Sequence, residues 1–570
     1  MARYGRRKVD VAGRMRAGLH RFVHDEDGAL IIFSLQIFIV MLVCTGIAID
    51  MVRVEERRAV IQNTIDRAAL AAASLSQDLD PKLVVKDYLS KAGLDYLNVN
   101  PTVEEGQFGE WRRVTISVDS QMPTIFGPLM GIQQLAASGD SQATESIGNV
   151  EISMVLDISG SMGETVSGSN TRISMLRSAA LNFVSEMFDM VQPPTAPAGR
   201  LSISVVPYNQ QVTLGSQLGS IFKLSTDHTQ NTCADVTTLP TNSISISPTT
   251  TLQRTMYGDS FDYWGQYELG QGSWTLETYA SDGIYNCTNA SAASVLAFSN
   301  SKSAIDAKIN GLTAGGDTAI DVGARWGLAL LDKETRPVLN TMISKGWASG
   351  SLTGRPFDYD DGTKEIDETA MKVLVLMTDG QNTRTYSTKS GYRTGASGFI
   401  STRCSTCFST NSTDWNSLWY YVPGLSKPYY SMRYKKWYYA SSVSGTKYDV
   451  DWSAIWAKGY TLQYVIDKFL YPPLYSRSYT NTKTKIYDDM AEQSEFTEKD
   501  TALKSLCTTA KDTKRNILIF TVAVDAPDAG VNILRECATA DAYAYDVTSS
   551  GLTDAFASIA SAINSLRLTN

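Results

Sequence analysis

The sequence predicts an α/β protein with a doubly wound, mostly parallel sheet, preceded by a transmembrane helix and a small α+β region. From residue 150, apolar runs such as VEISMVLD, RLSISVVPY and KVLVLMTDG alternate with amphipathic stretches. This alternation is typical of a parallel sheet covered by helices on both faces. An uncharged apolar run at residues 29–49 predicts the transmembrane helix. The length of 570 residues and a hydrophobic fraction of 43% leave room for a full core and exclude wholesale disorder.

Residues 1–28 are predicted to form a basic tail that stays in the cytoplasm. The first 21 residues contain the basic residues Arg3, Arg6, Arg7, Lys8, Arg14, Arg16 and Arg21 and a single acid, Asp10. The run ALIIFSLQIFIVMLVCTGIAI follows, and it matches the roughly 20 residues that a helix needs to cross a bilayer. It is longer than the core of a cleavable signal; the alternative is a buried helix. The positive-inside rule then places everything after the span on the far side of the membrane.

Residues 50–149 are predicted to be a membrane-proximal helix and a small α+β region. The stretch RVEERRAVIQNTIDRAALAAASLSQ lacks Pro and Gly and repeats apolar residues at helical spacing, so the helix should run on from the span to about Ser76. Asp80 and Pro81 should end it, and KLVVKDYLSKAG predicts a second, short helix. Residues 112 to 150 alternate more like strands, as in RRVTISV.

Residues 150–570 are predicted to be the α/β domain, interrupted by insertions at about 210–300 and 381–512. Its helices are expected at TRISMLRSAALNFVSEMF, DTAIDVGARWGLALLD and LTDAFASIASAINSL, and a further strand at NILIFTVAVD. Both insertions are rich in Ser, Thr, Gly, Asn and Tyr and lack helical periodicity. The second contains WYYVPGLSKPYYSMRYKKWYYASS, whose aromatic content argues against disorder. This stretch is either a self-packed loop or a binding surface, because Tyr, Trp and Arg are favoured interface anchors.

Cysteine usage agrees with a location beyond the membrane. Of the seven cysteines, Cys44 lies in the apolar run, and an even number remains for disulfides in an oxidising compartment. Six cysteines allow fifteen connectivities, but proximity along the chain favours the pairs Cys233–Cys287, Cys404–Cys407 and Cys507–Cys537. The alternative for CSTC is half of a zinc site or a redox pair; the chain has only three histidines and no second CxxC to support either.

Polar side chains follow the predicted strands at the point where each strand ends. Asp157, Ser159 and Ser161 lie in VLDISGSMGE, and Asp379 ends KVLVLMTDG. Thr318, in GGDTA, precedes a predicted helix and so belongs to the same edge of the sheet, where open α/β sheets bind their ligands. Two carboxylates and three hydroxyls, without His or thiol, suit Mg²⁺, Mn²⁺ or Ca²⁺ rather than zinc.

This set of five residues resembles the metal-ion-dependent adhesion site of the von Willebrand factor A domain. The resemblance implies that the three hydroxyls contact the metal, and that Asp157 and Asp379 act directly or through water. Neutral hydroxyls leave much of the charge of the ion uncompensated, so an open coordination position should attract a carboxylate from a protein partner. Mg²⁺ is the expected ion, with Ca²⁺ or Mn²⁺ as alternatives.

The N-terminal segment resembles the TadE/TadG-type segment of the tight-adherence (Flp) pilus assembly system. The resemblance is carried by DEDGA, the apolar span and RVEERRAVIQNTIDRAALAAASL. The stretches LRECATA and AFASIASAINSLRL near the C-terminus resemble the endings of TadG-like members that join this anchor to an A domain. Phe33 stands where a prepilin cleavage site would place Glu, five residues after Gly28, so the chain is expected to remain an uncleaved anchor.

The resemblances imply a metal-dependent adhesion or assembly factor of the bacterial inner membrane. Its bulk would be periplasmic or at the cell surface, and its partners would be pilus assembly components or pilins. The net charge of −8 gives no footprint for binding nucleic acid. A general surface adhesin unrelated to pili is an alternative.

An enzyme is not expected from this sequence. A serine hydrolase would need a base beside the serine, yet there is no GxSxG motif, and His228 falls in an insertion. A metal-dependent phosphoesterase is the better catalytic alternative, but it lacks a positioned general base or a phosphate clamp.

Overall fold

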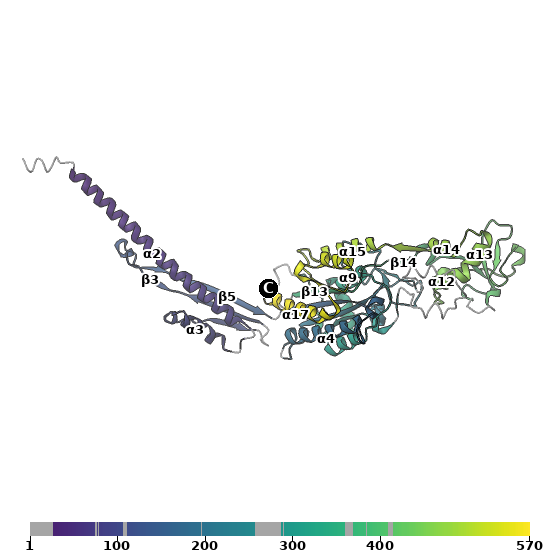
Figure 1. Ribbon diagram of the computed structural model, residues 1–570, viewed down its shortest axis with the longest axis horizontal. Helices are drawn as coiled ribbons and strands as arrows, with labels where there is room; N and C mark the ends of the chain where they lie inside the picture. Colours follow the sequence, from purple (N-terminus) through teal and green to yellow (C-terminus); the bar gives the residue numbers. More distant parts are fainter. Residues whose placement is uncertain are drawn as a thin grey trace, which may run out of the picture. The chain divides into compact units, whose positions relative to one another are not determined.

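The computed structural model divides the chain into two compact units, Met1–Ser146 and Ile147–Asn570 (Figure 1). It describes residues 27–569 except 75, 76, 78, 106–110, 147, 195, 257–286, 289, 360–368, 384 and 408–413. Almost all of the predicted basic tail therefore lies outside the described residues. We predicted the start of the α/β domain at residue 150, and the division between the units falls a few residues before it.

The N-terminal unit is built on one long helix, α2 (Asp27–Ala73), which runs without a break through the predicted span and the helix after it. Within it, Leu30–Ala73 contains a stretch with a mean hydropathy of 2.6 that is only 6% buried, so its length and composition suffice to cross a membrane. The second half of α2, which carries its charged residues, packs an Ala- and Ile-rich face on a small antiparallel sheet and on one helix. The strands of this sheet are β1 (Thr102–Glu105), β2 (Trp111–Val118) and β5 (Gly139–Ser146), and the helix is α3 (Pro81–Lys91).

The second unit contains the predicted doubly wound sheet. In spatial order its six strands are β12 (Leu296–Ser299), β9 (Leu201–Tyr208), β6 (Asn149–Asp157), β13 (Ala370–Thr378), β21 (Leu518–Val524) and β22 (Ala544–Val547). All neighbours are parallel except the edge strand β12, which is antiparallel to β9. The central strands are mostly apolar and are buried on both faces.

Helices cover both faces of this sheet (Figure 1). One face packs on α4 (Arg172–Val191), α8 (Lys302–Asn310) and α17 (Leu552–Thr569), around buried residues such as Phe183 and Phe556. The other face packs on α9 (Ile320–Ala329), α10 (Arg336–Ser344), α15 (Phe496–Ala510) and α16 (Asp528–Cys537). The alternation of side chains along each strand divides the core into these two clusters.

Residues 381–512, which lack helical periodicity in the sequence, contain regular structure. They form a five-stranded antiparallel sheet in the order β18 (Lys436–Tyr438), β17 (Tyr429–Ser431), β16 (Leu418–Tyr421), β15 (Ala396–Ser401) and β19 (Tyr448–Asp451). Short helices α11 (Trp452–Trp456), α12 (Leu462–Val465), α13 (Tyr471–Arg477) and α14 (Lys483–Met490) follow. The aromatic residues build a separate core that includes Phe399, Tyr430 and Trp456, which supports the self-packed interpretation. The last helix in this range, α15, belongs to the main α/β layer.

The first insertion is held to the second by a buried ion pair. Asp227 accepts two hydrogen bonds from the guanidinium of Arg393, at 3.0 and 2.7 Å, and both side chains are at most 5% exposed. Burial opposes ionisation of Asp227, but the hydrogen bond from Ser225 and the charge of Arg393 lower its pKa overall. Within the described residues, the first insertion also contributes the edge strand β12 and the short helix α5 (Gly215–Ile221).

All three predicted disulfides are present: Cys233–Cys287, Cys404–Cys407 and Cys507–Cys537. The last of these joins α15 to α16. Cys44 is a free, exposed cysteine on α2. Proximity along the chain was therefore a sufficient guide to the pairing.

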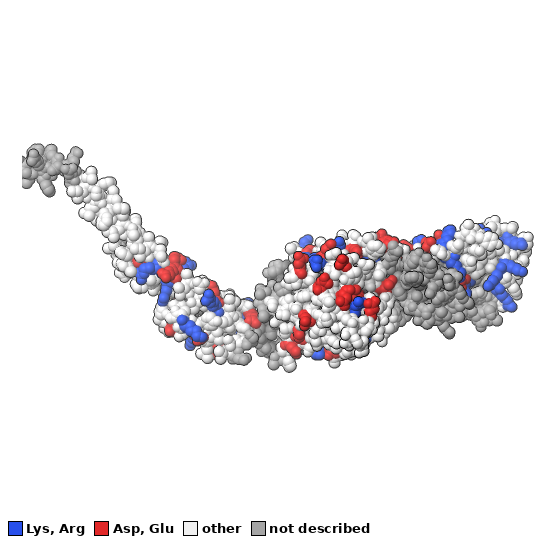
Figure 2. Space-filling model, viewed as in Figure 1, with Lys and Arg blue, Asp and Glu red and all other residues white. Residues whose placement is uncertain are grey.

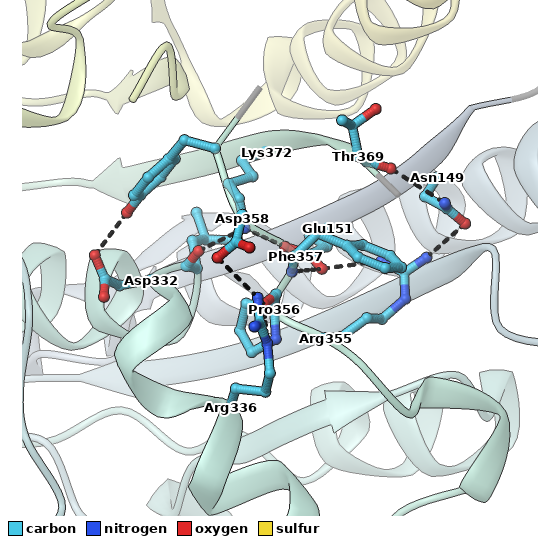
Figure 3. A network of polar contacts seen from close by, with 12 residues as sticks. Asn149, Glu151, Asp332, Arg336, Arg355, Pro356, Phe357, Asp358, Thr369 and Lys372 are labelled. Atoms are coloured by element: carbon cyan, nitrogen blue, oxygen red, sulfur yellow. Dashed lines mark hydrogen bonds and ion pairs between the residues drawn. The ribbon is translucent and has the colours of Figure 1, made fainter. Parts of the chain in front are cut away.

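A buried polar network closes the amino ends of β6 and β13 (Figure 3). Glu151 on β6 accepts from Lys372 Nζ on β13 at 2.6 Å and from Arg355 Nη1 at 3.2 Å, and all three side chains are at most 4% exposed. Arg355 also donates to the backbone carbonyls of Gly199 and Arg200. Each charge at this end of the sheet thus has a partner of opposite sign within the chain.

Candidate metal centre

The opposite, carboxyl edge of the same two strands brings the predicted site together. Asp157 is the last residue of β6, and Asp379 follows the last residue of β13. These strands are parallel neighbours with Leu156 paired to Met377, so their two carboxylates emerge side by side. Both are buried: Asp157 is 0% exposed and Asp379 is 4% exposed.

The loop after β6 turns its two serine hydroxyls toward Asp379. Ser159 N donates to Asp157 Oδ1 at 2.7 Å, which fixes the turn directly after the strand. Ser159 Oγ and Ser161 Oγ lie 3.1 Å apart, and Ser161 Oγ donates to Asp379 Oδ1 at 2.7 Å. Four of the five predicted residues therefore form one continuous set of contacts.

The loop that carries Thr318 packs directly on this turn. Gly315 N donates to Ile158 O at 2.8 Å, and Gly160 N donates to Gly316 O at 2.7 Å. The approach needs glycine, because a Cβ on Gly160 would lie 3.2 Å from Gly316 O, and Gly316 itself has a φ of +88°.

Thr318 is buried, and its side chain faces the residue that follows Asp379. A Cβ on Gly380 would lie 3.5 Å from Thr318 Oγ1. The backbone of Thr318 is held by Thr383, whose N–H and hydroxyl both donate to Thr318 O. The structure therefore gathers all five predicted residues at one edge of the sheet.

Two residues that the sequence reasoning missed complete the surroundings. Thr378 Oγ1 donates to Asp157 Oδ2 at 2.6 Å, so both oxygens of Asp157 are occupied by neutral donors. Arg172, the first residue of α4, lies 3.2 Å from Asp379 Oδ2 through Nη1 and also donates to Ser161 O. The sequence offered one signal for each of them: Thr378 directly precedes Asp379, and Arg172 is a charged residue at the start of a predicted helix.

The two carboxylates differ in how their charge is stabilised. Burial, followed by the charge of Asp379, raises the pKa of Asp157 to about 7, although the hydrogen bonds from Thr378 and Ser159 act in the opposite direction. Burial also raises the pKa of Asp379, against the hydrogen bond from Ser161 and the charge of Arg172. Asp157 therefore has hydrogen-bond donors but no ion-pair partner among the described residues.

The donor chemistry fits a small, hard cation. In an octahedral Mg²⁺ site, neighbouring ligand oxygens are about 2.9 Å apart, and the hydroxyls of Ser159 and Ser161 are 3.1 Å apart. Among the described residues, no group of three or more His, Cys, Asp or Glu side chains is placed to hold a metal ion. This edge offers hydroxyls beside its two carboxylates. Such a ligand set favours Mg²⁺, Mn²⁺ or Ca²⁺ over softer metals.

The arrangement gives no support to a nucleophilic serine. The hydroxyl of Ser159 lies against that of Ser161 rather than a histidine. His228 is buried in the first insertion, where its Nε2 contacts Thr255 O, and burial lowers its pKa to about 4. His20 and His24 lie outside the described residues.

Comparison with known proteins identifies a TadE/G-like domain at the N-terminus. Residues 28–75 match the family described as putative Flp pilus-assembly TadE/G-like. This match covers all of α2 except its first residue, and leaves the α/β unit unassigned. No curated protein matches the chain.

Several solved structures of pilus proteins are similar to the chain at a distant level. The vWF domain of the type V pili tip protein Mfa5 from Porphyromonas gingivalis shares 15% identity and a TM-score of 0.28, over 73% of this chain and 95% of that one. The PilB minor pilin from Streptococcus sanguinis shares 12% identity and a TM-score of 0.28, over 82% and 79%. The pilus adhesin RrgA from Streptococcus pneumoniae shares 9% identity and a TM-score of 0.29, over 82% and 49%. These likenesses are too distant to assign a function.

Proposed function

We propose that this chain is a membrane-anchored, metal-dependent protein-binding factor of Flp (Tad) pilus assembly or adhesion. The observation that carries the proposal is the convergence of Asp157, Ser159, Ser161, Thr318 and Asp379 at one sheet edge. The TadE/G-like segment supports the link to pili. In this proposal the second unit is a von Willebrand factor A domain of a TadG-like protein, and the chain has no catalytic role.

A divalent cation, with Mg²⁺ as the first choice, would be held by the three hydroxyls and the two carboxylates. A bound cation supplies a Lewis-acidic position that a carboxylate from another protein can occupy. Asp157 stabilises the cation with a buried negative charge, and Thr378 and Ser159 N fix the orientation of that carboxylate. Ser161 orients Asp379 through its hydroxyl. The partner is then a pilin or pilus assembly component that presents an acidic side chain.

The proposed location follows from α2 and the disulfides. An apolar helix of this length anchors the chain in the inner membrane, with the N-terminal tail in the cytoplasm. Three disulfides suit an oxidising compartment, so the second unit would lie in the periplasm or at the cell surface.

The proposal is tested by capturing partners from membranes with the full-length chain, crosslinked in Mg²⁺ or in EDTA. Mg²⁺ should be required for capture, and Asp157→Asn should remove both capture and Mg²⁺ binding measured by calorimetry. The matched control is Asp541→Asn, an exposed aspartate on the same unit, which should behave like the unchanged chain. Capture that is equal with Mg²⁺, with EDTA and in Asp157→Asn would overturn the metal-dependent mechanism.

A further inference from the structure

A hairpin of the N-terminal unit lies against the end of the apolar half of α2. Its strands are β3 (Gln121–Pro123) and β4 (Gln134–Ala136), joined by a loop that contains the short helix η2 (Gly127–Met130). Phe126 contacts the helix so closely that a Cβ on Gly46 would lie 2.5 Å from the Phe126 ring. Gly46 is within the predicted transmembrane segment, so this contact places the loop beside the end of the span.

The loop presents large apolar side chains to its surroundings. The exposed fractions are 60% for Ile125, 72% for Leu129, 56% for Met130 and 43% for Ile132. The stretch QMPTIFGPLMGIQQLAA, residues 121–137, contains no charged residue. Figure 2 shows that the visible face of the first half of α2 likewise lacks Lys, Arg, Asp and Glu. Clustered exposed apolar side chains of this kind mark an interaction surface.

The polar backbone of the loop is satisfied internally. Ile125 N, Phe126 N and Gly127 N donate to the Asp50 carboxylate at 2.9, 2.7 and 2.9 Å. Thr124 N, Leu129 N, Gly131 N and Ile132 N donate to backbone carbonyls of the same loop, and Pro128 has no N–H to satisfy. Irregular backbone tolerates an apolar surrounding best when its hydrogen-bonding groups have partners, and these seven N–H groups of the loop have them.

Asp50 on α2 accepts the hydrogen bonds from the loop and is covered by it. It is the first acid after the span and is only 3% exposed, because the three N–H groups of the loop cover its carboxylate. Beyond it, Met51 and Val52 are 60% and 67% exposed, so the apolar surface of α2 continues past residue 49. The loop thereby extends the apolar surface of the anchor sideways and hides the charge that would otherwise interrupt it.

We propose that the tip of this hairpin, residues 124–132, inserts into the membrane surface beside α2 and forms a second, shallow contact with lipid. The occupant is the lipid bilayer rather than a protein, because the exposed side chains are continuous with the apolar face of a helix that is itself long enough to cross it. Interfacial elements of this kind bury their apolar side chains at the boundary of headgroups and acyl chains. This proposal rests on the proposed membrane anchoring by α2.

The test is spin-label depth measurement on the full-length chain in nanodiscs of phosphatidylethanolamine and phosphatidylglycerol. Labels are placed by Leu129→Cys, Phe38→Cys and Leu79→Cys, each in a Cys44→Ala background, because Cys44 is the free cysteine of the described residues. Phe38 is 56% exposed in the middle of the span, and Leu79 is 62% exposed beyond the end of α2. Oxygen collisions report lipid, and collisions with a water-soluble nickel chelate report water.

The proposal expects the label at residue 129 to have a severalfold lower nickel collision rate than the label at residue 79. Because the proposed contact is shallow, this rate should still be higher than that of the label at residue 38. A lipid-exposed label at residue 38 together with a water-exposed label at residue 129 would overturn the hairpin contact alone. A water-exposed label at residue 38 would overturn the membrane anchor, and the hairpin contact with it. Since all three side chains are exposed, none of the substitutions removes a packed group.

Discussion

The two ends of strands β6 and β13 bury carboxylates in opposite ways. At the amino ends, Glu151 contacts two cations, Lys372 at 2.6 Å and Arg355 at 3.2 Å (Figure 3). At the carboxyl ends, Asp157 has only hydroxyl and N–H donors, and Asp379 shares one arginine with Glu164. Burying a charge costs free energy unless it is paired, so the carboxylate of Glu151 is compensated within the chain and that of Asp157 is not.

The difference separates a structural cluster from a proposed binding site. A carboxylate that already contacts two cations has nothing to gain from a further one, and Glu151 serves to fix the segment around Arg355 on the sheet. The carboxyl edge keeps a surplus of negative charge together with the hydroxyls of Ser159, Ser161 and Thr318. In the proposed function, binding of a cation would stabilise this edge.

The largest effect on stability is expected from Glu151→Gln at the amino ends of β6 and β13. This change leaves Lys372 and Arg355 buried without a counter-charge, which should lower the free energy of unfolding by about 3–5 kcal/mol. Urea unfolding of the second unit, followed by circular dichroism, measures the change. Asp489→Asn is the matched control, because its ion pair with Lys485 is half exposed and should contribute less than about 1 kcal/mol. Similar losses in both variants would contradict the comparison.

Asp157→Asn, at the carboxyl ends of the strands, should not lower the stability of the metal-free protein. Without metal, the variant should be at least as stable as the unchanged chain, because it removes a buried charge that no cation balances. With Mg²⁺ at a hundred times its dissociation constant, the unchanged chain should gain about 2.7 kcal/mol, and the variant should gain none. Thermal unfolding with and without Mg²⁺ gives both values. A variant that loses several kcal/mol in EDTA would show that Asp157 has a structural role like that of Glu151.

Thr378→Val tests the orientation of the Asp157 carboxylate with a smaller expected effect. The substitution keeps the shape of the side chain but removes the 2.6 Å hydrogen bond to Oδ2. Loss of a group that orients a metal ligand should weaken Mg²⁺ binding about tenfold. Calorimetric titration measures the affinity, and Thr521→Val on the neighbouring strand β21 serves as a buried control. Equal affinity in Thr378→Val and the unchanged chain would refute the orienting role.

The smallest effect is expected from Arg172→Gln. The guanidinium neutralises part of the charge of Asp379 and repels a nearby cation, so its removal should strengthen Mg²⁺ binding by a few fold, or about 0.5–1 kcal/mol. The effect should largely persist at high salt, because Arg172 and Asp379 are mostly buried and salt screens such pairs little. Calorimetry at low and high ionic strength checks both statements. Weaker binding in the variant would instead show that Arg172 organises the site.

The core of the fold was predictable because its strands are long and continuously apolar. Strand β6 and the helix α4 after it lie where the sequence placed them, since nine strand residues and an amphipathic 20-residue helix leave little ambiguity. The edge strand β12 was missed because it has four residues, and α15 was assigned to an insertion because it follows a long Tyr- and Ser-rich region. Short or displaced elements depend on tertiary packing that a local pattern does not contain.

The five site residues were predictable because strand order brings distant chain segments to one edge. The sequence placed Asp157 and Asp379 at the ends of two strands, and parallel pairing of these strands brings the two carboxylates together. Arg172 was not predicted, since no local pattern says that the first residue of a helix turns back to a strand end. The partners of Glu151 come from two separate segments and leave no signature in either of them.

The ion pair between Asp227 and Arg393 has a consequence for anyone who rebuilds this protein. It joins two insertions that leave the sheet at separate points, and Gln230, in the first, also donates to Ala457 O, in the second. Deleting either insertion alone would strand a buried charge in the other. The two insertions should therefore be deleted or exchanged together, although they are far apart along the chain.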